Sequence, residues 1–253
     1  MTRKIIDMRS RPSFLHDFYG ATQGTNEYEV AKWLNRRVGS KDDTHFTRSS
    51  TIEAFVEEVR EVGITAAVVV GRDTPTLTTS NQQIFEITTP YKELIGIGSV
   101  DPQKSNALAE IEHAVKQLGL VGINIEPGFG NPPLKADDPA LYPIYEACDQ
   151  LAFPNLAIVC YHGFYPYVSE MIGVAFRYEN VYVVPDMYIF LPGGSLYVEA
   201  ANGFMRDQLL FGSSYPFRAM GQTVDDFIKL GLHEQVLDGV LFQNAKRVLK
   251  LDI

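Results

Sequence analysis

Seven short apolar runs, rich in valine and isoleucine, recur along the chain with room for a helix between most of them. Runs of this length and composition are typical of strands buried on both faces of a parallel sheet. They lie at 4–8, 66–71, 95–100, 121–126, 156–161, 181–186 and 208–213. Strands that alternate with helices predict a parallel sheet covered by helices.

Helical periodicity fills most of the intervening segments. It predicts helices over 51–62, 105–119, 140–151 and 168–178, one that begins near 223, and an amphipathic stretch over 234–251. Ser50 and Glu53 have the spacing of a capping box for the first of these. This alternation predicts an α/β fold, with a closed (β/α)8 TIM barrel first and an open doubly wound sheet second. No glycine-rich phosphate loop follows a strand, which disfavours the open sheet and an NAD site.

Composition restricts the class of protein further. The length of 253 residues suits one domain over 1–253, and the net charge of −9 disfavours nucleic-acid partners. Cys148 and Cys160 have no paired spacing, which favours a reduced, cytoplasmic setting. The start MTRKIID lacks the pattern of a signal peptide, and no run approaches a membrane span. We therefore expect no membrane partner.

Polar residues follow most of the predicted strands. In a TIM barrel, catalytic side chains come from the carboxyl ends of the strands, so these residues are the candidates for a site. They are Asp7, Arg9, Ser10, Arg11, Arg72, Asp73, Asp101, Asn124, Glu126, Tyr161, His162, Asp186, Met187, Tyr188, Ser213, Ser214 and Tyr215. Of the five histidines, His162 alone stands at such an end.

Six stretches, in order along the chain, resemble a known family. They are IIDMRSRP, LYPIYEACDQL, FPNLAIVCYHG, FRYENVYVVPDM, LLFGSSYPF and VLFQNAKRVLKL. They resemble the amidohydrolase-related family, in the branch with lactone hydrolases and metal-dependent aromatic and aminocarboxymuconate-semialdehyde decarboxylases. The resemblance implies a TIM barrel, one divalent metal (zinc or manganese), a small anionic substrate and a homodimer.

Three residues, on two strands, depart from that family's pattern of metal ligands. Arg9 and Arg11 stand where the family has His-x-His on strand one, and a guanidinium has no lone pair to offer a metal. The family's FGSDYP is FGSSYP here, so Ser214 replaces an aspartate that serves as ligand and proton shuttle.

The family also has a strand, a loop and a helix between LYPIYEACDQL and FPNLAIVCYHG, which nearly adjoin here. Seven strands are therefore predicted, and the fifth βα unit of the barrel is missing. Three explanations compete. A segment was lost from the sequence, a second chain completes a truncated barrel, or LAIVCYHG is itself strand five. We expect a real missing unit, whose absence would expose sheet edges that need a cover.

The arginines are expected to hold an anion. Arg9 and Arg11 lie two apart on a strand and so point the same way, and Arg72 follows the second strand. They predict a clamp for a substrate carboxylate. The alternative for the first two is structural pairing with Asp7 or Glu126.

His162 and Asp186 are expected to move protons. His162 would be a general base or a remnant metal ligand, and the alternative is an ordinary strand-end histidine. Asp186 would orient His162 or act as the base itself, and its alternative is an arginine partner. A single metal held by Glu126, His162 and Asp186 is also considered.

Ser214 is a candidate nucleophile activated by His162, although no nucleophile elbow surrounds it. The alternative is turn chemistry before Pro216. Tyr188 and Tyr215 are candidate substrate contacts. The aromatic-rich segment 12–49 is expected either to close over the site as a lid or to form a packed helical insertion, with a helix over 26–36.

These features favour a hydrolase of a small carboxylated or cyclic substrate, such as a lactone or an aromatic-derived acid. The alternatives are a decarboxylase of the same branch and a non-catalytic binding protein that has lost its metal ligands.

Overall fold

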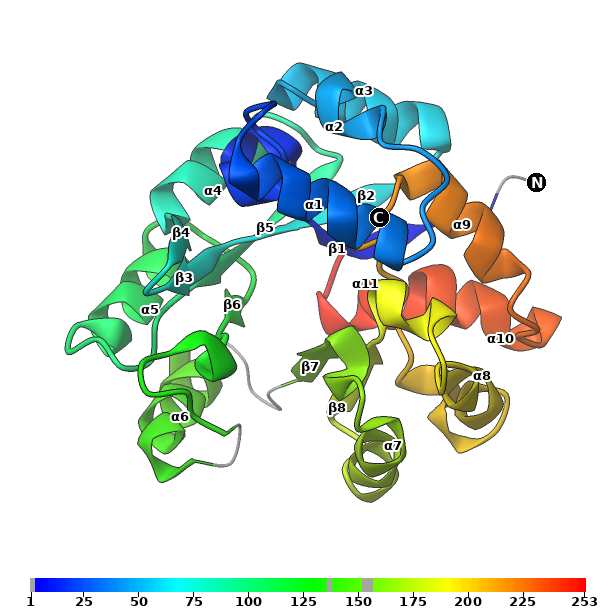
Figure 1. Cartoon of the computed structure of the whole chain (residues 1–253). Coiled ribbons are helices and arrows are strands. Elements are labelled where there is room, and N and C mark those ends of the chain that lie inside the picture. Colours follow the sequence, from blue (N-terminus) through cyan, green and yellow to red (C-terminus); the bar gives the residue numbers. More distant parts are fainter. Residues whose placement is uncertain (1–2, 136–137, 152–156) are drawn as a thin grey trace. The chain divides into compact units, whose positions relative to one another are not determined.

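The computed structural model describes residues 3–135, 138–151 and 157–253. The chain divides into two compact units. Unit 1 contains Met1–Ala67 and Ala157–Ile253, and unit 2 contains Val68–Leu156. Strands and helices alternate along the chain in both units, as the sequence predicts (Figure 1).

The regular elements of unit 1 are β1 (Ile6–Ser10), α1 (Asn26–Arg37), α2 (His45–Arg48), α3 (Ile52–Val62), β7 (Ile158–Tyr161), α7 (Val168–Arg177), β8 (Val181–Val184), α8 (Ser195–Ala201), α9 (Met220–Ile228), α10 (Glu234–Asp238) and α11 (Asn244–Val248). Strand β2 (Ala66–Val70) begins in unit 1 and ends in unit 2. The elements of unit 2 are β3 (Arg72–Thr74), β4 (Leu77–Thr79), α4 (Asn81–Thr88), β5 (Leu94–Ser99), α5 (Ala107–Lys116), β6 (Ile123–Asn124) and α6 (Tyr142–Leu151).

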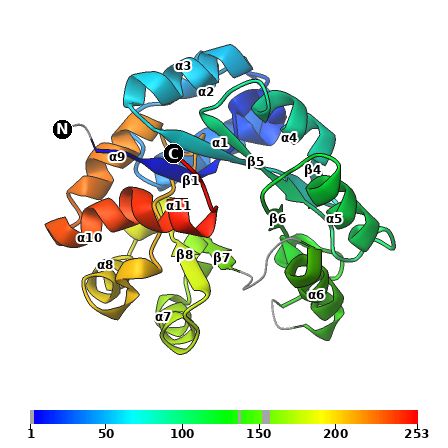
Figure 2. The ribbon, with the colours of Figure 1, turned by 180° about the vertical axis from the view of Figure 1, so that it is seen from behind.

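Parallel extended segments form the centre of unit 1. Strands β7 and β8 pair in a parallel register and lie side by side in Figures 1 and 2. The segment 209–215 continues this order, with a parallel bridge from Leu209 to Val183 of β8 and another from Tyr215 to Ser10 of β1. Because these segments run in one direction, their carboxyl ends meet at one edge of unit 1.

The core of unit 1 explains the continuous apolar runs. Met8, Val183, Leu210 and Phe211 are all fully buried, although neighbours along a strand face opposite ways. Both faces of these segments are therefore covered, which is why the runs lack an alternating pattern. Helix α11 packs beside β1 (Figures 1 and 2).

Unit 2 has a parallel pair, β5 and β6, and close helix packing on β5. Gly96 and Gly98 permit this packing. A Cβ on Gly96 would lie 2.8 Å from Thr88 Oγ1, and one on Gly98 would lie 2.9 Å from Asn81 Oδ1. The short antiparallel hairpin of β3 and β4 is not predicted by the apolar pattern.

Segment 12–49 contains helices α1 and α2 and is fixed to the rest of unit 1. Within the segment, the Ser13 hydroxyl donates to the carbonyls of Phe46 and Ser49 at 3.0 and 2.9 Å and so ties its start to its end. Buried Arg218 donates from Nη1 to the Val38 carbonyl at 2.5 Å. These contacts favour the helical-insertion alternative, and the helix predicted over 26–36 is confirmed as α1. The lid stays a prediction.

Three details differ from the sequence predictions. The cap of α3 is Thr51, whose hydroxyl accepts from the Ala54 N–H, so the capping box on Ser50 was wrong by one residue. The predicted strand 208–213 is an extended segment held by single bridges. The amphipathic stretch predicted over 234–251 is divided into α10, a π-helical turn at Gly239–Gln243, and α11.

Helix α6 ends at Leu151 and β7 begins at Ile158, and the missing fifth unit stays a prediction. Residues 152–156, which include the first residue of the predicted strand 156–161, lie outside the described residues.

Candidate active site

Three backbone turns mark the carboxyl edge of unit 1. His162, Asp186 and Ser214 have φ values of 59°, 44° and 61°, in the left-handed region that non-glycine residues rarely adopt. Each residue follows one of the neighbouring extended segments. Left-handed backbone at a non-glycine residue costs on the order of 1–3 kcal/mol and clusters at functional sites. All three predicted catalytic residues therefore have a strained backbone, a feature that Phe164, two residues after His162, shares with a φ of 56°.

His162 lies between an acid and a guanidinium group. Its Nδ1 is 2.7 Å from Oδ2 of Asp186, and its Nε2 is 3.5 Å from Nη2 of Arg9. The Asp186 side chain is fully buried, whereas 37% of the His162 side chain is exposed and can be reached by a ligand. Nδ1 and the carboxylate are within ion-pair distance, but among the described residues neither Nδ1 nor the two Asp186 oxygens make a hydrogen bond.

Aromatic rings surround these charges. The Arg9 guanidinium lies 4.6 Å from the centre of the Tyr161 ring. Tyr188 meets His162 edge to face at 5.2 Å, and Tyr165 stacks on Tyr188 at 4.9 Å. A guanidinium over a ring gains cation–π attraction, and flat rings offer a surface for a flat ligand.

Arg11 also contacts a tyrosine. Its guanidinium lies 5.6 Å from the ring of Tyr19, which belongs to segment 12–49. Both Arg9 and Arg11 are buried at this edge of unit 1. The expected pair of cations is therefore present, each beside an aromatic ring.

Asp7 supports Arg9 from within the core. Its Oδ1 accepts from the backbone N–H groups of Ser213 at 2.7 Å and Arg9 at 3.0 Å, and its Oδ2 accepts from the Ser213 hydroxyl. Burial raises the pKa of Asp7 to about 6, against these hydrogen bonds, and the charge of Asp186 raises it further. This acid thus fixes the backbone that carries Arg9.

Ser214 is joined to the same backbone. Its N–H donates to the Arg9 carbonyl at 3.0 Å, and its carbonyl accepts from Phe217 at 3.0 Å. Ser214 is buried. These contacts support the alternative, in which Ser214 forms the turn. Its role as a nucleophile stays a prediction.

Tyr215 takes part in a buried network away from the charged groups of the site. Its hydroxyl lies 3.1 Å from Oε2 of Glu58 and 3.0 Å from the carbonyl of His45, and it also contacts the Ser49 hydroxyl. The Ser49 hydroxyl in turn donates to Glu58 at 2.8 Å. These contacts link α3 to segment 12–49, and the substrate contact expected of Tyr215 stays a prediction.

Arg72 and Glu126 belong to unit 2 and pair with each other. Nε of Arg72 lies 3.0 Å from Oε2 of Glu126, and its guanidinium lies 4.6 Å from the Phe129 ring. Nδ2 of Asn124 donates to Oε1 of Glu126 at 3.2 Å. The structural alternative, in which an arginine pairs with Glu126, is thus realised by Arg72.

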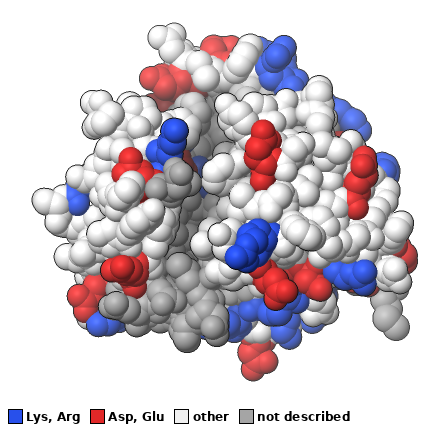
Figure 3. Space-filling model, turned by 90° about the horizontal axis from the view of Figure 1, so that it is seen from below, with Lys and Arg blue, Asp and Glu red and all other residues white. Residues whose placement is uncertain are grey.

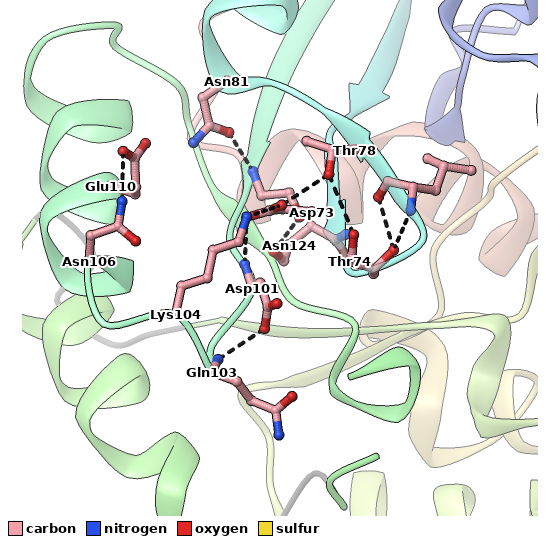
Figure 4. Close-up of polar contacts among 12 residues, drawn as sticks. Asp73, Thr74, Thr78, Asn81, Asp101, Gln103, Lys104, Asn106, Glu110 and Asn124 are labelled. Atoms are coloured by element: carbon pink, nitrogen blue, oxygen red, sulfur yellow. Dashed lines mark hydrogen bonds and ion pairs between the residues drawn. The ribbon is translucent and has the colours of Figure 1, made fainter. Parts of the chain in front are cut away.

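A second polar cluster of unit 2 surrounds Asp73 (Figure 4). Lys104 Nζ donates to both carboxylate oxygens of Asp73, at 2.7 and 2.8 Å. The Asp101 N–H donates to Oδ2 at 3.0 Å, and the Thr78 hydroxyl donates to Oδ1 at 3.2 Å. With so many donors, Asp73 acts as a structural tie between β3, β4 and the end of β5.

The residues of unit 1 do not fit a divalent metal at the place that the family resemblance implies. Arg9 Nη2 lies 3.5 Å from His162 Nε2, so a metal ion on this nitrogen would face a fixed positive charge. Two like charges about 4 Å apart repel by on the order of 4 kcal/mol per unit charge at an effective dielectric constant of ~20. Among the residues that the structure describes, no group of three or more His, Cys, Asp or Glu is arranged to hold a metal. Glu126, the third predicted ligand, belongs to unit 2.

Comparisons with solved structures define the class of fold. An uncharacterized TIM-barrel protein from Bordetella bronchiseptica is 29% identical, with a TM-score of 0.86 over 98% of each chain. A dihydroxybenzoic acid decarboxylase from Polaromonas, with bound manganese and an inhibitor, is 16% identical, with a TM-score of 0.65 over 99% of this chain and 97% of that one. A probable 2-pyrone-4,6-dicarboxylic acid hydrolase from Acinetobacter baumannii, with citric acid bound, is 14% identical, with a TM-score of 0.60 over 98% and 99%. The fold is an α/β TIM barrel, as predicted.

The amidohydrolase family model matches residues 39–152 and 151–251. The chain therefore belongs to this amidohydrolase family, which confirms the resemblance. A comparison with curated proteins gives no match.

Two other expectations concern the molecule's surroundings. No helix in the described segments is long and apolar enough to cross a membrane. Acidic and basic side chains are interspersed among uncharged ones on the face that Figure 3 shows. The homodimer and the cytoplasmic location stay predictions.

Two residues shape the site in ways that the sequence did not indicate: Asp7 was considered only as a partner of an arginine side chain, and Tyr161 was given no role. Both stood among the strand-end residues, and each is close in sequence to a candidate, Arg9 or His162. Adjacency was the available signal. What it does not reveal is that Asp7 holds the backbone of Arg9 and that the Tyr161 ring lies against its guanidinium.

Proposed function

We propose that this protein is a hydrolase of a small cyclic carboxylate, and that it works without a metal ion at the His162 edge of unit 1. The contact of His162 with both Arg9 and Asp186 carries this proposal. It brings an anion-binding group, a base and an orienting acid into direct contact. Arg9 and Arg11 would hold the acid group of the substrate. Arg72 would instead have a structural role, because it pairs with Glu126 within unit 2.

The geometry supports a proton-transfer role for His162. Asp186 is buried 2.7 Å from Nδ1, and once the two side chains align for a hydrogen bond it would hold a proton on Nδ1 and leave Nε2 basic. In the protein alone, Nε2 faces Arg9. A substrate carboxylate would attract Arg9 more strongly than a neutral imidazole does, because a charge-assisted hydrogen bond is roughly twice as strong as a neutral one. Binding of the substrate would therefore free Nε2 for chemistry.

For a lactone, the reaction would proceed as follows. Nε2 of His162 takes a proton from water while the water oxygen forms a bond to the lactone carbonyl carbon. The ring C–O bond then breaks, and the imidazolium returns the proton to the leaving oxygen. A guanidinium in a partly dry site stabilises the negative charge that develops on the carbonyl oxygen.

Decarboxylation of an aromatic acid is the second candidate. The stacked rings of Tyr165 and Tyr188 beside His162 favour it, because they offer a flat wall for an aromatic ring. His162 would then give a proton to the ring carbon that loses CO₂. One solved relative is named a dihydroxybenzoic acid decarboxylase and another a probable 2-pyrone-4,6-dicarboxylic acid hydrolase, so the fold suits both kinds of reaction.

Turnover measurements on two substrate sets would test the proposal. The first set contains 2-pyrone carboxylates, followed by loss of the pyrone absorbance, and the second contains hydroxybenzoates, followed by CO₂ release. We expect pyrone hydrolysis at a rate that a strong chelator leaves unchanged. His162→Gln should lower kcat by on the order of a hundredfold or more, as loss of a general base does. Arg9→Lys should chiefly raise KM, because lysine cannot make the bidentate contact.

His113→Gln is the matched control, since His113 is an exposed histidine on α5 in unit 2. It should leave turnover unchanged. Loss of turnover with the chelator and recovery with zinc or manganese would refute the metal-free mechanism. Turnover of neither set, together with no binding of any carboxylate, would favour a non-catalytic protein.

A further inference from the structure

Among the tyrosines of unit 1, Tyr161 has an unusual hydroxyl, a feature that it shares with Tyr19. Its oxygen is buried, and it has no hydrogen-bond partner among the described residues. By contrast, the hydroxyl of Tyr197 donates to the Gly163 carbonyl, and that of Tyr215 contacts Glu58. The interior of this unit therefore provides partners for the hydroxyls of Tyr197 and Tyr215 but gives none to that of Tyr161.

A buried hydroxyl without a partner is unfavourable by roughly 1–3 kcal/mol. Such a group in a catalytic edge is explained when it serves a ligand. Burial raises the pKa of Tyr161 to about 12, while the charges of Arg9 and Arg11 oppose that rise. The hydroxyl thus keeps its proton at neutral pH and acts as a donor.

The position of Tyr161 pairs this neutral donor with a cation. Its ring lies 4.6 Å from the guanidinium of Arg9, and the next residue is His162. The charges of Asp7 and Asp186 also act on its hydroxyl, which places it among the charged groups of the site. A ligand that meets Arg9 with a carboxylate would bring its neighbouring atoms toward these groups.

We propose that Tyr161 donates a hydrogen bond to an uncharged oxygen beside the carboxylate that Arg9 holds. The site would then prefer acids with a carbonyl or ring oxygen next to the carboxylate over acids that carry a methylene there. This inference rests on the proposed function, because it requires an acid bound at Arg9. It goes further by assigning a residue that sets the preference among acids.

Two acids of matched size can test this preference. Benzoylformate carries a carbonyl oxygen next to its carboxylate, and phenylacetate has a methylene group in its place. Their dissociation constants would be measured by titration calorimetry at pH 7 with the wild type and with Tyr161→Phe. Phenylalanine keeps the ring beneath Arg9 and removes only the donor.

We expect the wild type to bind benzoylformate roughly three- to tenfold more tightly than phenylacetate, as one hydrogen bond allows. Tyr161→Phe should reduce this ratio to near one and change the Kd of phenylacetate by less than about twofold. Tyr178→Phe is the control, because it removes an exposed hydroxyl from the same unit and should leave both constants unchanged.

The outcomes separate the two proposals. If both acids bind through Arg9, as shown by loss of binding in Arg9→Ala, but the ratio is the same in the wild type and Tyr161→Phe, the role of Tyr161 is refuted and the anion site stands. If the wild type binds neither acid, both proposals fail. If Tyr161→Phe weakened the binding of both acids equally, the hydroxyl would support the fold and would not distinguish between the ligands, which would refute its proposed role.

Discussion

Oδ1 of Asp7 accepts a hydrogen bond from the backbone N–H of Ser213 at 2.7 Å, across a sequence separation of 206 residues. The same oxygen accepts from the N–H of Arg9. One buried carboxylate therefore ties β1 to the last extended segment of unit 1. The guanidinium of Arg9 depends on this tie for its position beside His162.

The titration of Asp7 should appear in the pH dependence of stability. Its pKa is about 6 in the folded protein and 3.8 in a model peptide, so the folded state binds the proton more tightly. Its contribution is present in full below about pH 4 and is lost as the pH rises through 6, a change on the order of 3 kcal/mol. We expect Asp7→Asn to remove this decline, as measured by urea unfolding at pH 4 to 7.

The difference between wild type and Asp7→Asn at each pH isolates Asp7 from the other acids, several of which titrate in the opposite direction. Asp42, for example, has a pKa lowered by hydrogen bonds from Thr44. A difference that stays constant over the whole pH range would contradict the raised pKa of Asp7.

Asp186→Asn should separate orientation from binding. An amide cannot stabilise the charged imidazole that forms during proton transfer, so we expect kcat to fall by roughly a hundredfold or more. The KM should change little, because Asp186 is fully buried behind His162. Steady-state kinetics with whichever substrate the turnover measurements identify would give both kcat and KM. A rise in KM at constant kcat would instead assign Asp186 to substrate binding.

Ser214 allows a test of strain against nucleophilic catalysis. Because its φ is 61°, Ser214→Gly should stabilise the protein by about 0.5–1 kcal/mol, whereas Ser214→Ala should not. If the turn is its whole role, both variants keep turnover. Thermal unfolding and initial rates of the two variants would decide this. Abolished turnover in both, with the fold intact, would establish the predicted nucleophile.

Tyr215→Phe should weaken the fold more than ligand binding. It removes a hydroxyl that contacts Glu58 and the His45 carbonyl in a buried network, at an expected cost of about 1–2 kcal/mol. Urea unfolding would measure this loss. The affinity for carboxylates should stay as in the wild type. Weaker carboxylate binding without a loss of stability would restore Tyr215 as a substrate contact.

Part of the site could be predicted because of one rule of parallel sheets. The apolar runs fix where strands end, and the polar residues that follow meet at one edge. His162, Asp186 and Arg9 were found in this way, and the structure brings them into contact. The rule cannot distinguish one polar strand end from another, so Arg72, Glu126 and Tyr215 were predicted as site residues on the same grounds.

The sequence by itself determined the alternation of strands and helices, the family, and the replacement of two metal-ligand positions by Arg9 and Arg11. These follow from local periodicity and from the chemistry of single side chains, and neither requires knowledge of which residues are in contact. Only the tertiary structure decided that Asp7 accepts a hydrogen bond from the backbone of Ser213 and that the Tyr215 hydroxyl contacts Glu58. It also decided that the backbone is strained at His162, Asp186 and Ser214. Such contacts join residues far apart in the chain, and their energies depend on burial, which exists only once the chain has folded.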